Sequence, residues 1–214
     1  MHGSLTYNQK IIMHKFEELL KKNQSAEAFT SDYILYLSSL LTQLDKPAFA
    51  QIICILEHAR IQGNNIFLCG NGGSAATASH IAEDLALGPK KKGHMAFRTI
   101  SLTDNAASIT AIGNDDGYEE IFVKQLENLF NKGDLIIGIS ASGNSPNVIK
   151  ALEYANANGG ISIALTGFDG GKMKKISQHG LHVPSGPGEY EPVEDAHLVM
   201  GHILASYFKY QPHE

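Results

Sequence analysis

From residue 66 onward, short apolar runs alternate with stretches of helical periodicity, and this alternation constrains the fold more than any other feature of the chain. The apolar runs suit buried parallel strands and lie at Ile66–Cys69, Phe97–Leu102, Leu135–Ile139, Ile161–Leu165 and Leu181–Val183. Helical patterns follow most of them, at Ser74–Leu87, Tyr118–Asn131, Pro146–Asn158 and Ala196–Tyr210. Strands and helices that alternate in this way form a doubly wound parallel sheet with helices on both faces. We therefore predict an α/β fold around a five-stranded parallel sheet.

Amphipathic helices are predicted before the first strand. Apolar residues recur at three- and four-residue spacing in Ile11–Leu20, in Tyr33–Leu44 and, after Pro47, in Phe49–Leu56. The sequence shows no linker, so we expect one domain over residues 1–214, with a helical segment at about 7–62 and an α/β core at about 63–210. These helices carry more apolar surface than the sheet needs. Part of that surface is expected to pack against another subunit.

The composition excludes several classes of protein. A net charge of −5 gives no sign of a nucleic-acid-binding face, and the short cluster Lys90–Lys92 is interpreted as a solvated turn. The opening segment Met1–Lys22 is polar and amphipathic, unlike a signal peptide, and no apolar run reaches membrane-spanning length. Cys54 and Cys69 lie in apolar runs and are interpreted as buried free thiols of a reducing compartment. We expect a soluble cytoplasmic protein with no nucleic-acid or membrane partner.

The apolar run Leu135–Ile139 ends in a loop with three hydroxyls, those of Ser140, Ser142 and Ser145, and a helical pattern begins at Pro146. Such a loop presents hydroxyls and free backbone N–H groups at a helix N-terminus, where an anion is favoured. The loop holds no Lys or Arg, so a phosphate would be bound by neutral donors. Neutral donors suit a phosphate that has to be released again. The competing interpretation is a serine-rich turn with a capping serine.

The same chemistry recurs earlier, where the run Ile66–Cys69 ends in the loop Gly70–Ser74 and a helix follows. Three glycines in this loop allow positive φ and a close approach of backbone to a ligand. The loop also fits the dinucleotide-binding fingerprint, but no acidic residue ends a second strand about 20 residues later, as that fold requires. Recurrence of the pattern favours two phosphate-binding loops over two ordinary turns.

Four motifs together resemble the phosphoheptose isomerases, which are sugar-isomerase (SIS) domain proteins. They are Cys69–Ser74, Ala111–Asp115, Gly138–Lys150 and Leu165–Met173. The resemblance extends from about Lys10 to Lys209 and implies a single SIS domain.

The resemblance implies a set of site residues. The substrate-binding positions that it implies are Asn71, Gly72, Gly73, Ser74, Asp84, Asn114, Asp115, Ser140, Ala141, Ser142, Ser145 and Glu194. It implies a site for one zinc ion at His80, Asp84, Glu194 and His202. The family has Glu where this chain has Asp84, and Gln where it has Glu194. Both departures fall within the implied metal site.

The spacing of His80 and Asp84 is compatible with metal binding, because residues four apart share one face of a helix. Alternatives remain on this helix. A lone helical histidine is more often bonded to a carbonyl group, and Glu83 on the same turn competes with Asp84 as the nearby carboxylate or is simply solvated.

Glu194 and His202 are eight residues apart, or about 12 Å along a continuous helix. One ion can bind both only if Glu194 precedes the helix or if the ligands come from two subunits. His197, between them, could be a core or an interface residue. Other histidines, among them His58, His94 and His179, are interpreted as incidental.

The chemistry implied by the resemblance is the aldose–ketose isomerisation of sedoheptulose 7-phosphate to D-glycero-D-manno-heptose 7-phosphate, the first step of nucleotide-activated heptose biosynthesis. Asp84 would be the base and His202 the acid, while the metal ion would polarise the carbonyl. Two histidines and two carboxylates suit zinc and tolerate manganese or iron. Asp is shorter than Glu by one methylene, and a misplacement of about 1 Å can cost a factor of ~10² in rate.

Two alternatives stay open. One is an isomerase that acts on a different sugar phosphate, suggested by Asp84, Glu194 and the unusual loop Leu85–His94. The other is a non-catalytic SIS protein that binds a replication initiator. Retention of His80 and His202 favours an enzyme, because a scaffold needs no converging ligands. By resemblance, we expect a homotetramer with sites at subunit interfaces.

Overall fold

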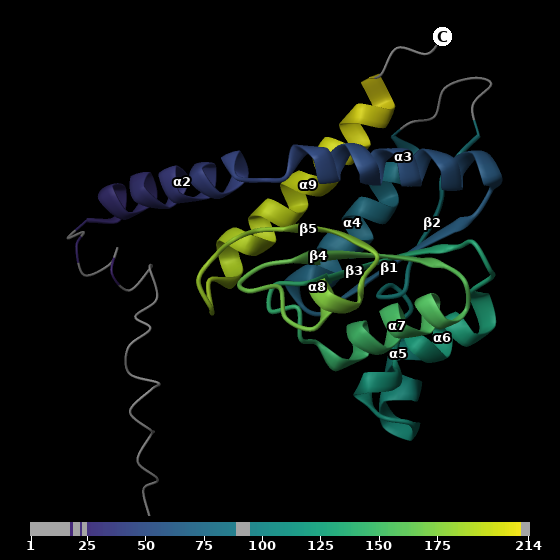
Figure 1. Cartoon of the computed structure of the whole chain (residues 1–214). Helices are drawn as coiled ribbons and strands as arrows, with labels where there is room; N and C mark the ends of the chain where they lie inside the picture. The colour runs from purple at the N-terminus through teal and green to yellow at the C-terminus, as the bar shows by residue number, and fades with distance from the viewer. Residues whose placement is uncertain (1–17, 19–21, 23–24, 89–94, 211–214) are drawn as a thin grey trace, which may run out of the picture.

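The computed structural model describes residues 18, 22, 25–88 and 95–210, and within this part five parallel strands form one sheet (Figure 1). The strands are β1 (Asn65–Gly70), β2 (Arg98–Ser101), β3 (Leu135–Ser140), β4 (Ile161–Thr166) and β5 (His179–His182). Their order in the sheet is β2-β1-β3-β4-β5. The predicted five-stranded parallel sheet is confirmed, with strand ends that differ from the prediction by at most two residues.

The strand order reverses between β1 and β3, because β1 pairs with β2 on one side and with β3 on the other. In open parallel sheets, ligands bind in the crevice that such a reversal leaves at the carboxyl ends of the strands. The two small-residue loops follow these two strands directly, at Asn71–Gly72 and Ala141–Ser145. The topology therefore brings both predicted phosphate loops to one crevice.

Two layers of helices cover the sheet (Figure 1). The first layer contains α3 (Lys46–Gln62), α4 (Gly73–Leu87) and α9 (Tyr190–Tyr210). The second contains α6 (Val123–Leu129), α7 (Pro146–Ala157) and the short α8 (Met173–Ile176). Successive strand residues alternate between the layers: Ile66 and Leu68 pack in the first core, while Phe67 packs in the second. Burial on both faces explains why the central strands β1, β3 and β4 read as continuous apolar runs.

Two of the three helices predicted before the sheet lie in the described part of the chain, and both form. In α2 (Ala26–Thr42), the backbone N–H of Ala28 donates to the capping hydroxyl of Ser25, and in α3 the capping carboxylate belongs to Asp45. Helix α2 extends past the sheet (Figure 1), and Ile34 and Leu35 on it are 57% and 67% exposed. Packing of this apolar surface on another subunit stays a prediction.

The structure differs from the predicted helices in three places. A helix that was not predicted, α5 (Ala106–Asp115), follows β2, and it has no fully buried residue to give it a strong apolar pattern. The predicted helix Tyr118–Asn131 is divided into the 3-10 turn η2 (Tyr118–Glu120) and α6. Helix α9 begins at Tyr190 rather than Ala196, because Pro192 lies where a first-turn proline is tolerated.

One cysteine prediction was wrong. Cys69 is buried in β1, but Cys54 on α3 is exposed, because Ile52 and Leu56 form the inward face of that helix and Cys54 lies between them on the outer side. Several predictions lie outside the described residues, namely the helix Ile11–Leu20, the cluster Lys90–Lys92 and His94.

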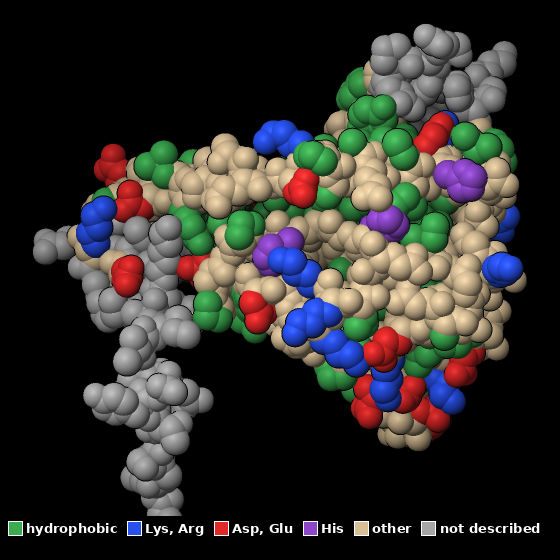
Figure 2. Space-filling model, viewed as in Figure 1, with side chains coloured by type: hydrophobic (Ala, Val, Ile, Leu, Met, Phe, Trp, Pro, Cys, Tyr) green, Lys and Arg blue, Asp and Glu red, His purple; other side chains and the backbone are tan. Residues whose placement is uncertain are grey.

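Basic and acidic side chains are intermixed over the second helical layer (Figure 2). Lys150 pairs with Glu120, and Lys172 pairs with Glu153 at 2.6 Å. These two lysines of the described part of the face therefore have acidic neighbours. Within the described part of the chain, the helices are too short or too polar to span a bilayer.

Candidate active site

The first loop connects β1 to α4 and leaves the N-terminus of that helix open. Gly72 takes a positive φ of 54°, and no described side chain caps the helix, so its first backbone N–H groups are available to a ligand. A Cβ at Gly73 would lie only 2.2 Å from a carboxylate oxygen of Glu194, so a larger residue here would require the Glu194 side chain to move. Ser74 on the first turn is buried at 5% exposure. The loop has the open donors of an anion site.

The second loop gathers the three predicted hydroxyls. Ser140 Oγ lies 3.0 Å from Ser145 Oγ and 3.5 Å from Ser142 Oγ. Gly143 takes a positive φ of 64°, and a Cβ there would overlap the carbonyl oxygen of Gly170. Helix α7 starts at Pro146, and the hydroxyl of its N-cap residue, Ser145, does not cap the helix. The Ser145 hydroxyl thus contacts Ser140 rather than the helix, and it lies at a helix N-terminus, where an anion is favoured.

Asn71 and Asn147 join the two loops through a pair of reciprocal amide hydrogen bonds. Asn71 Nδ2 donates to Asn147 Oδ1 at 2.9 Å, and Asn147 Nδ2 donates to Asn71 Oδ1 at 2.8 Å. The hydroxyl of Tyr118 also donates to Asn71 Oδ1, at 3.0 Å. Sequence reasoning missed Asn147 and Tyr118, since a pairing between residues 76 positions apart leaves no local pattern.

Asn114 and Asp115 occupy the last turn of α5, where Asn114 Nδ2 donates to Asp115 Oδ1 at 2.7 Å. Both side chains are exposed. Among the described residues, no hydrogen bond joins this pair to either loop. Asp115 precedes Tyr118 by three residues. The contact of Tyr118 with Asn71 therefore keeps the end of α5 near the first loop.

His80, Asp84 and His202 come together on α4 and α9. His80 Nε2 lies 3.2 Å from His202 Nε2, and Asp84 Oδ2 lies 3.4 Å and 3.7 Å from these two nitrogens. All three ligand atoms lie within 4.8 Å of one another. The i, i+4 spacing places His80 and Asp84 on one face of α4, and the neighbouring α9 supplies His202.

The three donors fit a small divalent ion. Two nitrogen ligands of a tetrahedral zinc ion, each about 2.0–2.1 Å from the metal, lie about 3.3 Å apart. The separations in the cluster lie close to this value. His80 and His202 have side chains that are 47% and 50% exposed, so the cluster has an open side. Asp84 and His202 line a cavity of about 190 Å³ next to it.

Glu194 lies apart from this cluster within one chain. It belongs to α9, so the alternative that it precedes the helix is wrong, and it is about 12 Å from His202 along the helix axis. Its carboxylate lies against Gly73, beside the first loop. Burial raises the pKa of Glu194, and the nearby Glu191 and Asp195 raise it further.

Helices α4 and α9 run in the same direction and connect the loop to the cluster. Glu194 lies at the first turn of α4, and His202, eight residues later on α9, lies at His80. His80 is seven residues beyond Gly73, or about 10 Å along the axis of α4. The cluster and the open N-terminus of α4 thus lie about 10 Å apart along the same helix.

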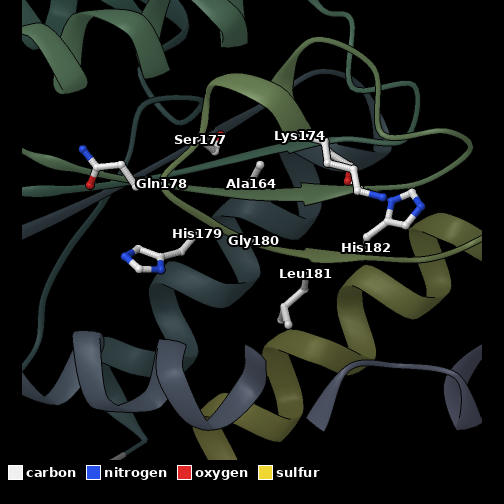
Figure 3. A pocket seen from close by; sticks show the side chains of 9 residues that line it. Ala164, Lys174, Ser177, Gln178, His179, Gly180, Leu181 and His182 are labelled. Carbon is white, nitrogen blue, oxygen red and sulfur yellow. Dashed lines mark hydrogen bonds between the residues drawn. The ribbon is translucent and has the colours of Figure 1, made fainter. Parts of the chain in front are cut away.

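The other histidines of the described residues do not join the cluster. His197 is fully buried in the core, and burial lowers its pKa to about 4. A separate cavity of about 190 Å³ lies between α8 and the edge strand β5, and there Lys174 and His182 point toward each other (Figure 3). Burial, together with Lys174, lowers the pKa of His182. None of the residues predicted for the site lines this cavity.

Comparisons with known proteins show which proteins this chain resembles. The family model described as the SIS domain matches residues 30–167. The chain is 45% identical to a phosphoheptose isomerase of Nitratiruptor over 157 residues, which are 73% of this chain and 81% of that protein. It is 43% identical to one of Helicobacter pylori over 168 residues, covering 78% of this chain and 85% of that protein. The solved structure of the phosphoheptose isomerase of Neisseria gonorrhoeae is similar with a TM-score of 0.77 and 30% identity, over 86% of this chain and 97% of that one.

Proposed function

The chain belongs to the phosphoheptose isomerases of the SIS-domain family, and we propose that it converts sedoheptulose 7-phosphate to D-glycero-D-manno-heptose 7-phosphate. The reaction is an aldose–ketose isomerisation, an intramolecular redox reaction. In heptose metabolism it supplies the phosphorylated aldose from which a nucleotide-activated heptose is made. One observation carries the proposal: the cluster of His80, Asp84 and His202 lies on the helix whose N-terminus forms the first phosphate loop.

The two loops are proposed to hold the phosphate group. Ser140, Ser142 and Ser145 supply neutral hydroxyl donors, and the open N-terminus of α4 supplies backbone N–H groups. Helix dipoles from α4 and α7 favour the phosphate charge without a fixed lysine or arginine. Neutral donors bind the phosphate and still allow the product to leave.

His80, Asp84 and His202 are proposed to hold one divalent ion, with zinc as the expected metal. A bound ion would supply Lewis-acid stabilisation of the negative charge that develops on the sugar oxygens. The open side of the cluster leaves coordination positions for the sugar, for water or for a side chain of a neighbouring protomer.

Asp84 and His202 are proposed to move the protons. Asp84 accepts the proton from C1 of the ketose, and the electrons of the C–H bond form the C1–C2 double bond as the carbonyl oxygen on C2 takes a proton. His202 delivers a proton to C2, while the hydroxyl on C1 loses its own proton and becomes the aldehyde. Both side chains line the cavity beside the cluster, so both can reach a sugar bound there.

Glu194 is proposed to contact the substrate near the phosphate loop, where its carboxylate lies against Gly73. Its distance from His202 leaves the fourth metal position to another group, and in a homotetramer that group can be Glu194 of a neighbouring protomer. The exposed apolar residues Ile34 and Leu35 of α2 support such an assembly.

The test is turnover by purified, metal-replete protein offered a panel of phosphorylated ketoses. Sedoheptulose 7-phosphate is expected to give the highest kcat/KM, and the variant Asp84→Ala is expected to lose turnover while it still binds inorganic phosphate. Higher kcat/KM with another ketose phosphate would transfer the proposal to that sugar. Absence of turnover with every ketose would overturn it.

A further inference from the structure

We propose that Tyr118 and Asn147 are positioning residues that hold the two phosphate loops in register. The loops come from different strands, and no backbone hydrogen bond among the described residues links Asn71–Gly72 to Ala141–Ser145. The side chains of Asn71 and Asn147 supply the link instead, with their two reciprocal hydrogen bonds of 2.8 and 2.9 Å.

The hydrogen-bonding capacity of this pair is almost fully used. Asn71 Oδ1 accepts from Asn147 and from Tyr118, and Asn147 Oδ1 accepts from Asn71 and from the backbone N–H of Val148 at 3.0 Å. A carbonyl oxygen has two lone pairs, so neither amide oxygen is free to accept from a ligand. Asn71, predicted to contact substrate, therefore keeps only one free side-chain N–H for that role. Its main role in this geometry is to connect the loops.

Asn147 is held inside the protein, at 1% exposure, on the first turn of α7. If the two loops separated, the buried amide of Asn147 would lose its partner and become an unsatisfied polar group, which is unfavourable in free energy. The hydrogen-bonded arrangement of the loops is therefore favoured. Asn147 follows Ser145 by two residues, so the link anchors the start of α7 close to that hydroxyl. The link acts on both loops at once.

Tyr118 extends the link to the segment that carries Asn114 and Asp115. The turn η2 is fixed to α7 by Lys150, which pairs with Glu120 and lies 3.9 Å from Glu119. Tyr118 then connects η2 to the first loop. These groups line a cavity of about 320 Å³ beside the second loop, formed by Asn71, Tyr118, Glu119, Ser145, Pro146, Asn147 and Lys150.

The positioning role predicts a specific change in KM and kcat. If both loops hold the sugar's phosphate, as proposed, a looser link weakens binding of that group equally in the ground state and the transition state. Loss of such uniform binding raises KM and leaves kcat unchanged. A residue that merely stabilised the fold would instead lower the melting temperature and the amount of active protein.

The decisive variant is Tyr118→Phe, which removes one hydroxyl from a side chain that is 58% exposed and leaves the core intact. We expect the KM for sedoheptulose 7-phosphate and the Kd for inorganic phosphate to rise together by about 3- to 10-fold, the effect of one lost hydrogen bond, with kcat and melting temperature unchanged. Tyr154→Phe is the matched control, because among the described residues the hydroxyl of Tyr154 has no hydrogen-bond partner. It should leave all four quantities at their wild-type values.

A second variant, Asn147→Asp, keeps the acceptor for Val148 but removes the donor to Asn71 and adds a negative charge. It should weaken phosphate binding more than Tyr118→Phe does. Phosphate Kd values within twofold of wild type in both variants would overturn the positioning role. Because inorganic phosphate binding is measured directly, this outcome is distinct from a failure of the wild-type protein to isomerise the heptose, which would refute the proposed function alone.

Discussion

Substitution of Gly201 by alanine is expected to separate the two helices that carry the metal cluster. Gly201 on α9 lies against Ile81 on α4, and a Cβ at this position would be 2.4 Å from Ile81 Cγ1 and 2.8 Å from Cδ1. Ordinary carbon–carbon contacts are about 3.5–4.0 Å, so the helices must move apart by roughly 1 Å. Ile81 is buried at 1% exposure and β-branched, so its χ1 angle is strongly restricted within α4 and Cγ1 cannot easily turn away.

The free energy of unfolding should fall by about 1–3 kcal/mol, the usual cost of an extra carbon in a packed core. For a chain of this size, the melting temperature then drops by roughly 2–12 °C. Since His202 follows Gly201 and His80 precedes Ile81, the same movement widens the 3.2 Å spacing of the two imidazole nitrogens. Metal affinity should fall, and activity should fall by up to ~10².

Thermal unfolding and the metal content of the purified variant measure both effects. Gly113→Ala on α5 is the control for stability, because the nearest atom to its new Cβ would be Ile121 Cγ2 at a comfortable 3.8 Å. Alanine also favours a helix over glycine, so the control should keep or raise the melting temperature. Wild-type stability together with wild-type metal content in Gly201→Ala would refute the reasoning.

Three further outcomes are expected. Asp84→Glu should lower metal affinity and activity by about tenfold. Asp84 Oδ2 already lies 3.4 Å from His80 Nε2, so the carboxylate of a longer side chain would extend past the metal position. Activity that holds or rises would mean that Asp84 only approximates a longer carboxylate. Ser142→Ala and Ser145→Ala should each raise the KM for substrate with melting temperatures unchanged, and wild-type KM values in both would remove the phosphate assignment. Burial lowers the pKa of His197 to about 4 in the folded protein. Between about pH 6.5 and 4 the unfolded chain therefore binds one proton more than the folded chain, and the free energy of unfolding should fall by about 3 kcal/mol as the pH drops through that window. Denaturant unfolding at several pH values should show a flatter dependence for His197→Gln, and an equally steep one would contradict this source of acid sensitivity.

The sheet and both loops could be predicted because their signals are local. Each strand is a short apolar run, and each loop places small or hydroxyl residues directly after one. Two of the three clustered ligands, His80 and Asp84, also have a local signal in their four-residue spacing on a helix. The resemblance to phosphoheptose isomerases added His202, which the geometry of α9 brings to the other two.

Other features depend on packing between distant segments and could not be predicted. The pairing of Asn71 with Asn147, and the contact of Tyr118 with it, appear only when the crevice between β1 and β3 forms. Helix α5 has no fully buried residue, and only the partly buried Ile109 and Ile112 of this helix pack against the core. Cys54 lies in an apolar run but faces outward, since a helix turns only part of such a run toward the core.

The most direct test is isomerisation of sedoheptulose 7-phosphate by the metal-replete protein in deuterated water, followed by NMR. Proton transfer between C1 and C2 through side chains of the cluster predicts an aldose product that carries solvent deuterium at C2, with the signal lost in Asp84→Ala. Recovery of unchanged ketose, with no deuterium at C1 and no aldose formed, would contradict the assignment of His80, Asp84 and His202 to the chemistry of this site.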